Sequence, residues 1–375
     1  MRVLISGGAG FIGSHLCRVL LDRGHEITVL DSLHPQIHGL GRTFTDIAEL
    51  SGARCLLGDV RDRSAWLEAL DGQEAVVHLA ADTGTGQSMY EVERYVDVNA
   101  RGTALLLDVL ANARHGVARV VVASSRAVYG EGKYRCREHG IVFPQARRGS
   151  DMEAGDFAVK CPMCRSDVAM HPTDEDSKLH PTSVYGISKF VQEQLVATVA
   201  SSLGLSAGVL RFQNVFGPGQ SLSNPYTGII SIFSTRMLRD EPIAVFEDGT
   251  ESRDFVYVSD VVEATRRAVE SAAGGIETYN IGTGTATSVL QVAQTLRYEL
   301  GSSSTVDVNG KFRVGDIRHC VADMSRARER LEVPPTMPFE EGIRRFVHWA
   351  REQATAVDDR YGDSLEEMRR RGLYR

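Results

Sequence analysis

The chain has 375 residues, of which 42% are apolar and 24% charged, and its formal net charge at pH 7 is −7. This composition is ordinary for a globular protein with a sizeable core, and the negative charge excludes the broad basic surface that nucleic acid or anionic lipid would require. No apolar run approaches the roughly 20 residues of a membrane span. The opening MRVLISGG resembles a buried strand rather than a secretion signal. We therefore expect a cytoplasmic protein with neither a nucleic-acid nor a membrane partner.

Short β-branched runs alternate along the chain with longer helical patterns. The strand patterns occur at 2–6, 26–31, 54–59, 75–80, 119–125 and 208–212. The helical patterns occur at 11–23, 62–70, 88–114 and 182–203. Such alternation is typical of βαβ units, and near-continuous apolar strands fit a sheet that is covered on both faces. The sequence therefore predicts an α/β protein with a Rossmann-type, doubly wound parallel sheet.

This alternation breaks twice. Residues 131–180 are polar and rich in Gly, Pro, Cys and Arg, which indicates an insertion into the first domain. Beyond Phe216 the patterns become short and mixed. We predict a first domain from 1–216 that is completed by 255–274, and a smaller mixed α/β domain from 217–254 and 275–345. A charged tail, 346–375, follows.

The first strand ends in GGAGFIG, residues 7–13, and a helix opens directly after it. Glycines at this place permit a tight turn, close approach of the backbone to a pyrophosphate, and close helix packing, whereas a glycine turn without a ligand is the competing interpretation. Asp31 ends the second strand, where a carboxylate accepts ribose hydroxyls and repels a 2′-phosphate. We therefore predict that the first domain binds NAD as its cofactor. Its expected contacts are Gly7, Gly10, Phe11, Ile12, Gly13 and Asp31, with Asp59 and Val60 at the adenine and Leu79, Ala80 and Ala81 beside the pyrophosphate.

SVYGISK places Tyr185 and Lys189 four residues apart, on one face of a helix. A phenol with a pKa of about 10 is a poor base at neutral pH, but a neighbouring ammonium and a cationic nicotinamide both favour the phenolate. Ser125, at the end of the fifth strand, supplies a third polar group. A surface tyrosine with a solvated lysine is the alternative for this spacing taken alone.

GGAGFIG, SSRAVYG (124–130) and YGISK together resemble the extended short-chain dehydrogenase/reductase family, in particular its NAD-dependent nucleotide-sugar epimerases and dehydratases, over residues 1–345. The resemblance implies Tyr185 as acid/base and Lys189 as its electrostatic partner and a nicotinamide-ribose ligand. Ser125 would donate to the reacting oxygen, and Asn99 would be structural. It makes the second domain the nucleotide-sugar domain, with substrate contacts at Thr85, Gln87, Ser125, Asn214, Arg253 and Arg313. Arg318 is a further candidate, and surface ion pairing remains open for each arginine.

Arg126 and Ala127 limit which of the family's reactions this sequence can support. The family's 4,6-dehydratases carry an Asp-Glu pair directly after the catalytic Thr, and its decarboxylases commonly keep the Glu. Elimination of water needs a base and an acid, which Arg126 and Ala127 cannot supply, although Glu131 lies close in sequence. Epimerisation at C4 needs no second pair. The sequence therefore favours a 4-epimerase.

Within the family, TGTGQS (83–88), SSRAVYGEG, the insertion with its CxxH and CxxC pairs, and SNPYTG (223–228) together look most like the dTDP-L-rhamnose 4-epimerases, which form dTDP-6-deoxy-L-talose. A UDP-hexose 4-epimerase and a nucleotide-linked 4-keto-sugar reductase are the enzymatic alternatives. A third alternative is a non-catalytic protein, either an NAD sensor or a scaffold organised by zinc.

Cys136 and His139, and Cys161 and Cys164, form two ligand pairs at short spacing in the insertion. Such pairs are typical of structural zinc sites. Free reduced cysteines and a redox CxxC are the alternatives, and His171 and His180 are spare ligands.

The family resemblance further implies a homodimer in which helices matching 92–114 and 182–203 form a four-helix seam.

Overall fold

The computed structural model describes residues 1–224, 226, 228–353 and 361–374, so parts of SNPYTG and of the predicted tail lie outside the described residues. Its centre is a seven-stranded sheet in the order β14-β9-β5-β4-β1-β2-β3, with every neighbouring pair parallel. The strands are β1 (Arg2–Ser6), β2 (Glu26–Asp31), β3 (Arg54–Leu57), β4 (Ala75–His78), β5 (Arg119–Ser125), β9 (Ser206–Phe212) and β14 (Ile276–Ile281). The structure confirms the predicted Rossmann-type sheet.

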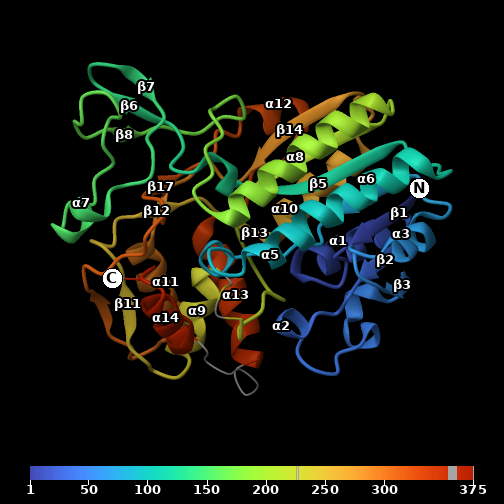
Figure 1. The fold of residues 1–375 in the computed structure, drawn as a ribbon. Coiled ribbons are helices and arrows are strands. Elements are labelled where there is room, and N and C mark those ends of the chain that lie inside the picture. Colours follow the sequence, from blue (N-terminus) through green and yellow to red (C-terminus); the bar gives the residue numbers. More distant parts are fainter. Residues whose placement is uncertain (225, 227, 354–360, 375) are drawn as a thin grey trace.

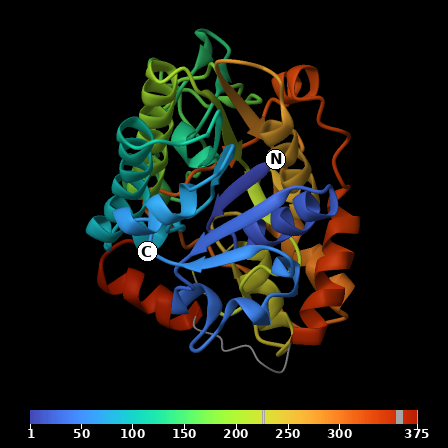
Figure 2. The same cartoon turned by 90° about the vertical axis from the view of Figure 1, so that its right-hand side faces the viewer.

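Helices cover both faces of this sheet (Figures 1 and 2). Successive strand residues point to opposite faces, so Val3 and Ile5 join one apolar core while Leu4 joins the other. The first core includes residues of α1 (Phe11–Asp22) and α10 (Val258–Glu270). The second includes residues of α3 (Arg63–Leu70), α6 (Gly102–Asn112) and α8 (Val184–Ser202). Two buried faces explain the near-continuous apolar strands.

Short elements connect the sheet to the site. They are α2 (Pro35–His38), α4 (Thr85–Ser88), α5 (Val92–Tyr95), a π-helical turn (Val96–Arg101) and 3₁₀ turns at Phe44–Asp46, Ala48–Leu50 and Arg126–Tyr129. Among the described residues, none of the helices combines the length and apolar character that a bilayer span requires.

The smaller lobe follows β10 (Asn214–Phe216), which pairs in parallel with β13 (Phe255–Tyr257). A parallel pair joins β11 to β16, and β15-β12-β17 form a three-stranded sheet. The elements are α9 (Ile229–Met237), β11 (Ile243–Val245), β12 (Ser252–Arg253), β15 (Thr287–Ser288), α11 (Val289–Leu300), β16 (Val306–Val308), β17 (His319–Cys320), α12 (Ser325–Arg330), α13 (Phe339–Gln353) and α14 (Tyr361–Arg370).

Two segments lie elsewhere than the sequence pattern places them. The pattern assigns residues 275–345 to the second domain, yet β14 pairs with β9 at the edge of the main sheet. It begins the tail at 346, yet Phe346 and Ala350 of α13 are fully buried in the first core. Both differences arise because long-range packing, which local pattern does not report, decides which sheet or core a short segment joins.

The insertion is also more regular than its sequence indicated. An antiparallel sheet β7-β6-β8 is built from β6 (Tyr134–Cys136), β7 (Gly140–Val142) and β8 (Ala169–Met170), and α7 (Gly149–Glu153) lies between β7 and β8 in sequence. These strands are only two or three residues long, too short to produce a readable periodicity.

His78 forms a buried polar link between the sheet and α6. Its Nδ1 lies 2.6 Å from Ser6 Oγ, and its Nε2 lies 3.0 Å from Thr103 Oγ1. The ring packs edge-on against Trp66. Burial, together with the charge of Lys189, lowers the pKa of His78 to about 3, so the imidazole is neutral in the folded protein.

We expect His78 to make the fold acid-sensitive. Its ordinary pKa is 6.5, so between pH 6.5 and about 3 the unfolded chain binds more protons than the folded one, and stability falls as pH falls through that window. One such group changes the unfolding constant by up to about tenfold per pH unit. Urea denaturation of the wild type and His78→Gln at pH 7.5, 5.5 and 4.5 should show a smaller acid loss in the variant. Identical pH profiles would contradict this role.

Candidate active site

The turn after β1 has space for backbone alone. Gly7 has φ +75°, and a Cβ there would lie 2.6 Å from the Ala80 nitrogen. A Cβ on Gly13 would lie 2.2 Å from the Gly7 carbonyl oxygen. The helix that follows has Gly10 as its N-cap, with no side-chain cap and no acidic residue in its first turn. Its first N–H groups, at Phe11 and Ile12, therefore form the kind of helix terminus that binds a pyrophosphate.

Asp31 lies beside this turn at the end of β2. Its carboxylate accepts hydrogen bonds from the Ala9 nitrogen at 3.0 Å and the Leu33 nitrogen at 2.9 Å. These bonds fix the carboxylate at the carboxyl edge of the sheet, where a dinucleotide ribose binds in such folds.

The other predicted cofactor residues lie along the same edge. The Leu79 and Ala80 nitrogens both donate to the Ser6 carbonyl at 2.9 Å, and Ala81 follows them. Val60 is buried, and its carbonyl accepts from Trp66 Nε1 at 2.7 Å. Asp59, which pairs with Arg61 at 2.6 Å, precedes it. The residues at this edge fit NAD, which they would hold across the ends of β1, β2 and β4.

Lys189 projects from α8 into the protein interior. The helix begins after Ser183, whose Oγ accepts from the Gly186 nitrogen at 3.1 Å. Lys189 Nζ donates to the Ala123 carbonyl of β5 at 2.9 Å. Burial lowers the pKa of Lys189 to about 7, while the nearby Glu193 opposes that shift. The ammonium is therefore held beside the end of β5, one helical turn from Tyr185.

Tyr185 keeps a partly exposed surface, and its ring meets that of Tyr95 edge-on with centroids 6.5 Å apart. Desolvation raises the pKa of the Tyr185 phenol, whereas a hydrogen bond with Ser125 and the charge of Arg126 lower it. Ser125 Oγ also accepts from the Ala127 nitrogen at 3.2 Å. The structure thus places Ser125, Tyr185 and Lys189 where β5 ends against the first turns of α8.

An ion pair behind the site holds α8 against the sheet. Arg211 of β9 donates to both Glu193 oxygens at 2.9 and 2.8 Å, and the Ser124 hydroxyl donates to the same carboxylate. Ser124 and Ser125 therefore differ in role, because Ser124 binds this internal carboxylate. Sequence reasoning missed the pair, although Glu193 follows Lys189 by one helical turn.

Asn99 is structural, as the family resemblance implied. It is fully buried, donates through Nδ2 to Ser188 Oγ at 3.0 Å and to the Asp82 carbonyl at 3.0 Å, and accepts from the Asp82 nitrogen at 2.8 Å. It thereby joins α8 to the loop after β4.

Arg126 faces the same region as Tyr185. Its Nε donates to Asn214 Oδ1 at 2.7 Å. Within the described part of the chain this is the hydrogen bond that Arg126 makes, so its terminal N–H groups are available to a ligand. Burial and the nearby Arg253 lower the pKa of Arg126. Arg126 thus offers donors, rather than an acid/base pair, at this position.

Arg253 and Arg313 are the predicted substrate contacts that the smaller lobe contributes. Arg253 donates to the Ile317 carbonyl at 2.7 Å and pairs with Asp316 at 3.1 Å. Arg313 lies over the Phe246 ring at 5.0 Å and donates to Tyr361 Oη of α14 at 3.0 Å. No local pattern in the sequence indicated that α14 would reach this arginine.

Arg318, the spare candidate, is engaged elsewhere. It pairs with Glu247 and Asp248, both at 2.6 Å. Of the remaining predicted contacts, Thr85 is exposed at the start of α4, whereas Gln87 is buried and accepts from Gln36 Nε2 at 3.1 Å.

Glu131 is also engaged in an internal ion network. One oxygen accepts from the Arg318 nitrogen at 3.0 Å and from Tyr134 Oη at 3.3 Å. The other lies 3.4 Å from Arg147 Nε, and both side chains are almost fully buried. These contacts give Glu131 a structural role instead of that of a substitute base.

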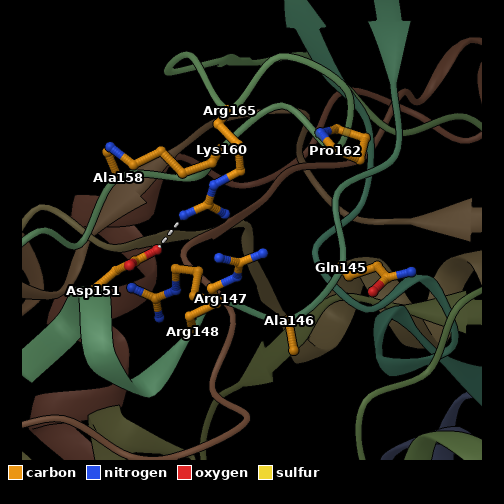
Figure 3. Close-up of a pocket in the computed structure, with 9 residues that line it drawn as sticks. All are labelled: Gln145, Ala146, Arg147, Arg148, Asp151, Ala158, Lys160, Pro162 and Arg165. Carbon is orange, nitrogen blue, oxygen red and sulfur yellow. Dashed lines mark hydrogen bonds and ion pairs between the residues drawn. The ribbon is translucent and has the colours of Figure 1, made fainter.

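A cavity of about 190 Å³ lies within the insertion, and none of the predicted site residues lines it (Figure 3). Several basic side chains line it, but Arg165 pairs with Asp151 at 2.6 Å and Arg147 with Glu247 at 2.7 Å. This cavity is a feature of the insertion's packing, not of the site.

Comparisons with known proteins agree with this geometry. The model of the NAD dependent epimerase/dehydratase family matches residues 3–146 and 162–282. The chain is 37% identical to a dTDP-L-rhamnose 4-epimerase of Burkholderia thailandensis, over 93% of this chain and 94% of that protein. The UDP-glucose 4-epimerase of Thermotoga maritima, solved with UDP-glucose, has a TM-score of 0.76 at 30% identity, over 94% of this chain and 99% of that one. The UDP-glucose 4-epimerase of Thermus thermophilus, solved with NAD, has a TM-score of 0.73 at 28% identity, with the same coverage.

The chain therefore belongs to the NAD-dependent epimerase/dehydratase family. It is an enzyme, an isomerase of that family.

Tyr185→Phe should reduce turnover by two or more orders of magnitude, which is the range of general acid/base groups. The fold and bound NAD should remain, because only a hydroxyl is removed. Steady-state kinetics and the absorbance of released cofactor measure the two effects. Tyr298→Phe, which alters a tyrosine that is 83% exposed on α11, is the matched control and should leave turnover unchanged. Near-normal turnover of the Tyr185 variant would remove Tyr185 from the mechanism.

Proposed function

We propose that the protein is an NAD-dependent 4-epimerase of a nucleotide sugar. The observation that carries this proposal is the set Ser125, Tyr185 and Lys189 beside Arg126 and Ala127. One acid/base group with its supports is present, and the two residues after Ser125 supply donors and a methyl group instead of a second pair. Such a set suits oxidation and reduction at a single carbon.

Each residue has a defined task in this proposal. Bound NAD supplies a reversible hydride acceptor. Tyr185 accepts the 4-hydroxyl proton and returns it. The charge of Arg126 lowers the pKa of the Tyr185 phenol, and the Lys189 ammonium, one helical turn away, would also favour the phenolate that this requires. Ser125 donates to the reacting oxygen of the 4-keto sugar. The keto sugar must present its other face before it is reduced.

The diphosphate would bind between the two lobes. Arg126 comes from the 3₁₀ turn after β5 and Asn214 from β10, whereas Arg253 and Arg313 come from the smaller lobe. Guanidinium groups with free N–H donors suit phosphate oxygens. Arg253 and Arg313 would exchange part of their present contacts for the phosphates.

We further propose dTDP-L-rhamnose as substrate and dTDP-6-deoxy-L-talose as product. The B. thailandensis relative supports this assignment across nearly the whole chain. A 6-deoxy sugar has no C6 hydroxyl to eliminate. This agrees with the presence of Arg126 and Ala127 at the positions where elimination of water would need an acid/base pair. The T. maritima likeness favours a UDP-hexose as the second candidate. A 4-keto-sugar reductase would use the same residues but release its cofactor, and Asp31 opposes the 2′-phosphate of NADP.

Isotope labelling tests the reaction. With dTDP-L-rhamnose deuterated at C4, we expect an equilibrium mixture of 4-epimers that retains deuterium at C4, because the hydride that leaves C4 returns there. In heavy water, C5 should gain no deuterium, since no residue of the SSRAVYG loop (124–130) is placed to remove its proton. Added NADH should not be consumed. NMR and mass spectrometry follow the label. Deuterium at C5, loss of a hydroxyl, or stoichiometric cofactor use would refute the epimerase proposal.

A homodimer would form through α5, the π-helical turn and α8. Val92 and Val96, one helical turn apart, are 48% and 45% exposed, and Ile187 on α8 is 47% exposed. A second copy would cover these apolar side chains.

The six free cysteines are consistent with the cytoplasmic location expected from the sequence.

Val96→Glu should weaken this dimer because it would bury a charge at the seam. Light scattering after size-exclusion chromatography should give roughly twice the chain mass of 41.1 kDa for the wild type and a lower mass for the variant. Val308→Glu, at a similarly exposed valine on β16, is the control. A monomeric wild type would refute the dimer.

A further inference from the structure

The insertion has little core of its own. Its buried apolar cluster consists of Tyr134, Cys136, Val142, Val159 and Cys161. A second small cluster joins Met152 and Phe157 of the insertion to Phe312. The family model does not match residues 147–161. Figure 1 shows this sheet at one end of the molecule, beyond β12 and β17. Segments with so small a core usually need a crosslink or a metal to hold their fold.

Two tight turns meet in this insertion. Cys136 and His139 lie in the hairpin between β6 and β7, in which Cys136 pairs with Gly140. Cys161 and Cys164 lie in a second turn, between the bridge partners Lys160 and Asp167. Each turn therefore presents two ligand atoms, and the turns face one another.

Three of the six distances between the ligand atoms match the edges of a tetrahedral zinc site. Cys136 Sγ lies 3.7 Å from Cys164 Sγ and 3.6 Å from His139 Nδ1, and Cys161 Sγ also lies 3.6 Å from His139 Nδ1. All four ligand atoms lie within 4.8 Å of one another. Zinc bonds of about 2.3 Å to sulfur and 2.0 Å to nitrogen give tetrahedral edges of about 3.5 to 3.8 Å. A disulfide would require sulfurs about 2.05 Å apart.

We propose that Cys136, His139, Cys161 and Cys164 bind one structural Zn²⁺. Three sulfurs and one imidazole are a ligand set that zinc favours, and four protein ligands leave no open position for catalysis. Ser166 Oγ, 3.0 Å from Cys164 Sγ, is placed to donate to a thiolate. The cysteine pair lies in a turn, whereas a thioredoxin-type pair opens a helix. The spare His171 and His180 lie outside this group.

The insertion that carries the proposed zinc site also contacts the segment that carries the predicted substrate residue Arg313. Arg147 of the insertion donates to the Asp316 carbonyl at 3.0 Å, and Glu131 accepts from the Arg318 nitrogen at 3.0 Å. The Thr173 nitrogen donates to the Val321 carbonyl at 2.8 Å. These contacts fasten the insertion to the segment that carries Arg313 and Asp316. Loss of zinc should therefore weaken substrate binding and leave bound NAD in place, an effect on KM that rests on the proposed function.

Metal analysis tests the site without any substrate. The full-length protein, purified with a thiol reductant, should contain about one zinc per chain by elemental analysis. Cys161→Ser should lose it, whereas Cys55→Ser, which alters a half-buried cysteine on β3, should keep it. If Cys161→Ser does not fold, protein produced with Co²⁺ provides the second measurement. A tetrahedral thiolate site should then show strong visible d–d bands and thiolate-to-cobalt absorption.

Wild-type protein that holds no stoichiometric zinc and takes up no Co²⁺ with these bands would overturn the proposal. So would a disulfide between any two of the four ligand positions. Zinc present in an inactive protein would support the metal site and refute the proposed reaction, so the two proposals fail independently. With activity present, KM should rise several-fold in Cys161→Ser with a smaller change in kcat.

Discussion

The attachment of α8 to the end of β5 is the constraint on which the site depends. Lys189 reaches the Ala123 carbonyl, and Glu193, one turn further along the helix, binds Ser124 and Arg211. These contacts bury charge, which is costly unless each group has a partner, so the helix can take few other positions against the sheet. Tyr185 is thereby placed beside Ser125, at the edge where the glycine turn accommodates a dinucleotide.

The two residues after Ser125 define the reaction that this site supports as much as the triad does. Arg126 supplies a cation and N–H donors near Tyr185, and Ala127 supplies a backbone N–H to Ser125. A cation stabilises a phenolate and attracts phosphate, but a guanidinium cannot exchange a proton near neutral pH. In the proposed reaction Arg126 therefore serves binding and charge balance, and Tyr185 would carry the proton transfer.

The smaller lobe and the insertion are joined by buried charges. Arg147 and Arg318 share Glu247, and Glu131 lies against both. Removing one member would leave an unpaired buried charge, so this network favours a single arrangement of the insertion against residues 313–323. The proposed zinc would hold the other end of the same insertion, and metal and ion network would together position Arg253 and Arg313.

The sequence by itself determined the local features: the parallel α/β sheet, the glycine turn with Asp31, and the helix that carries Tyr185 and Lys189. These depend on hydrophobic period, on spacing within one helix and on turn chemistry, all of which are short-range. It also identified the four cysteine and histidine positions, but not their convergence. Only the tertiary structure decided that β14 joins the main sheet, that Glu193 pairs with Arg211, that Glu131 and Arg318 belong to an ion network, and that α14 reaches Arg313. Each of these joins residues far apart in the chain, and such contacts are chosen by packing and charge pairing that no local pattern records.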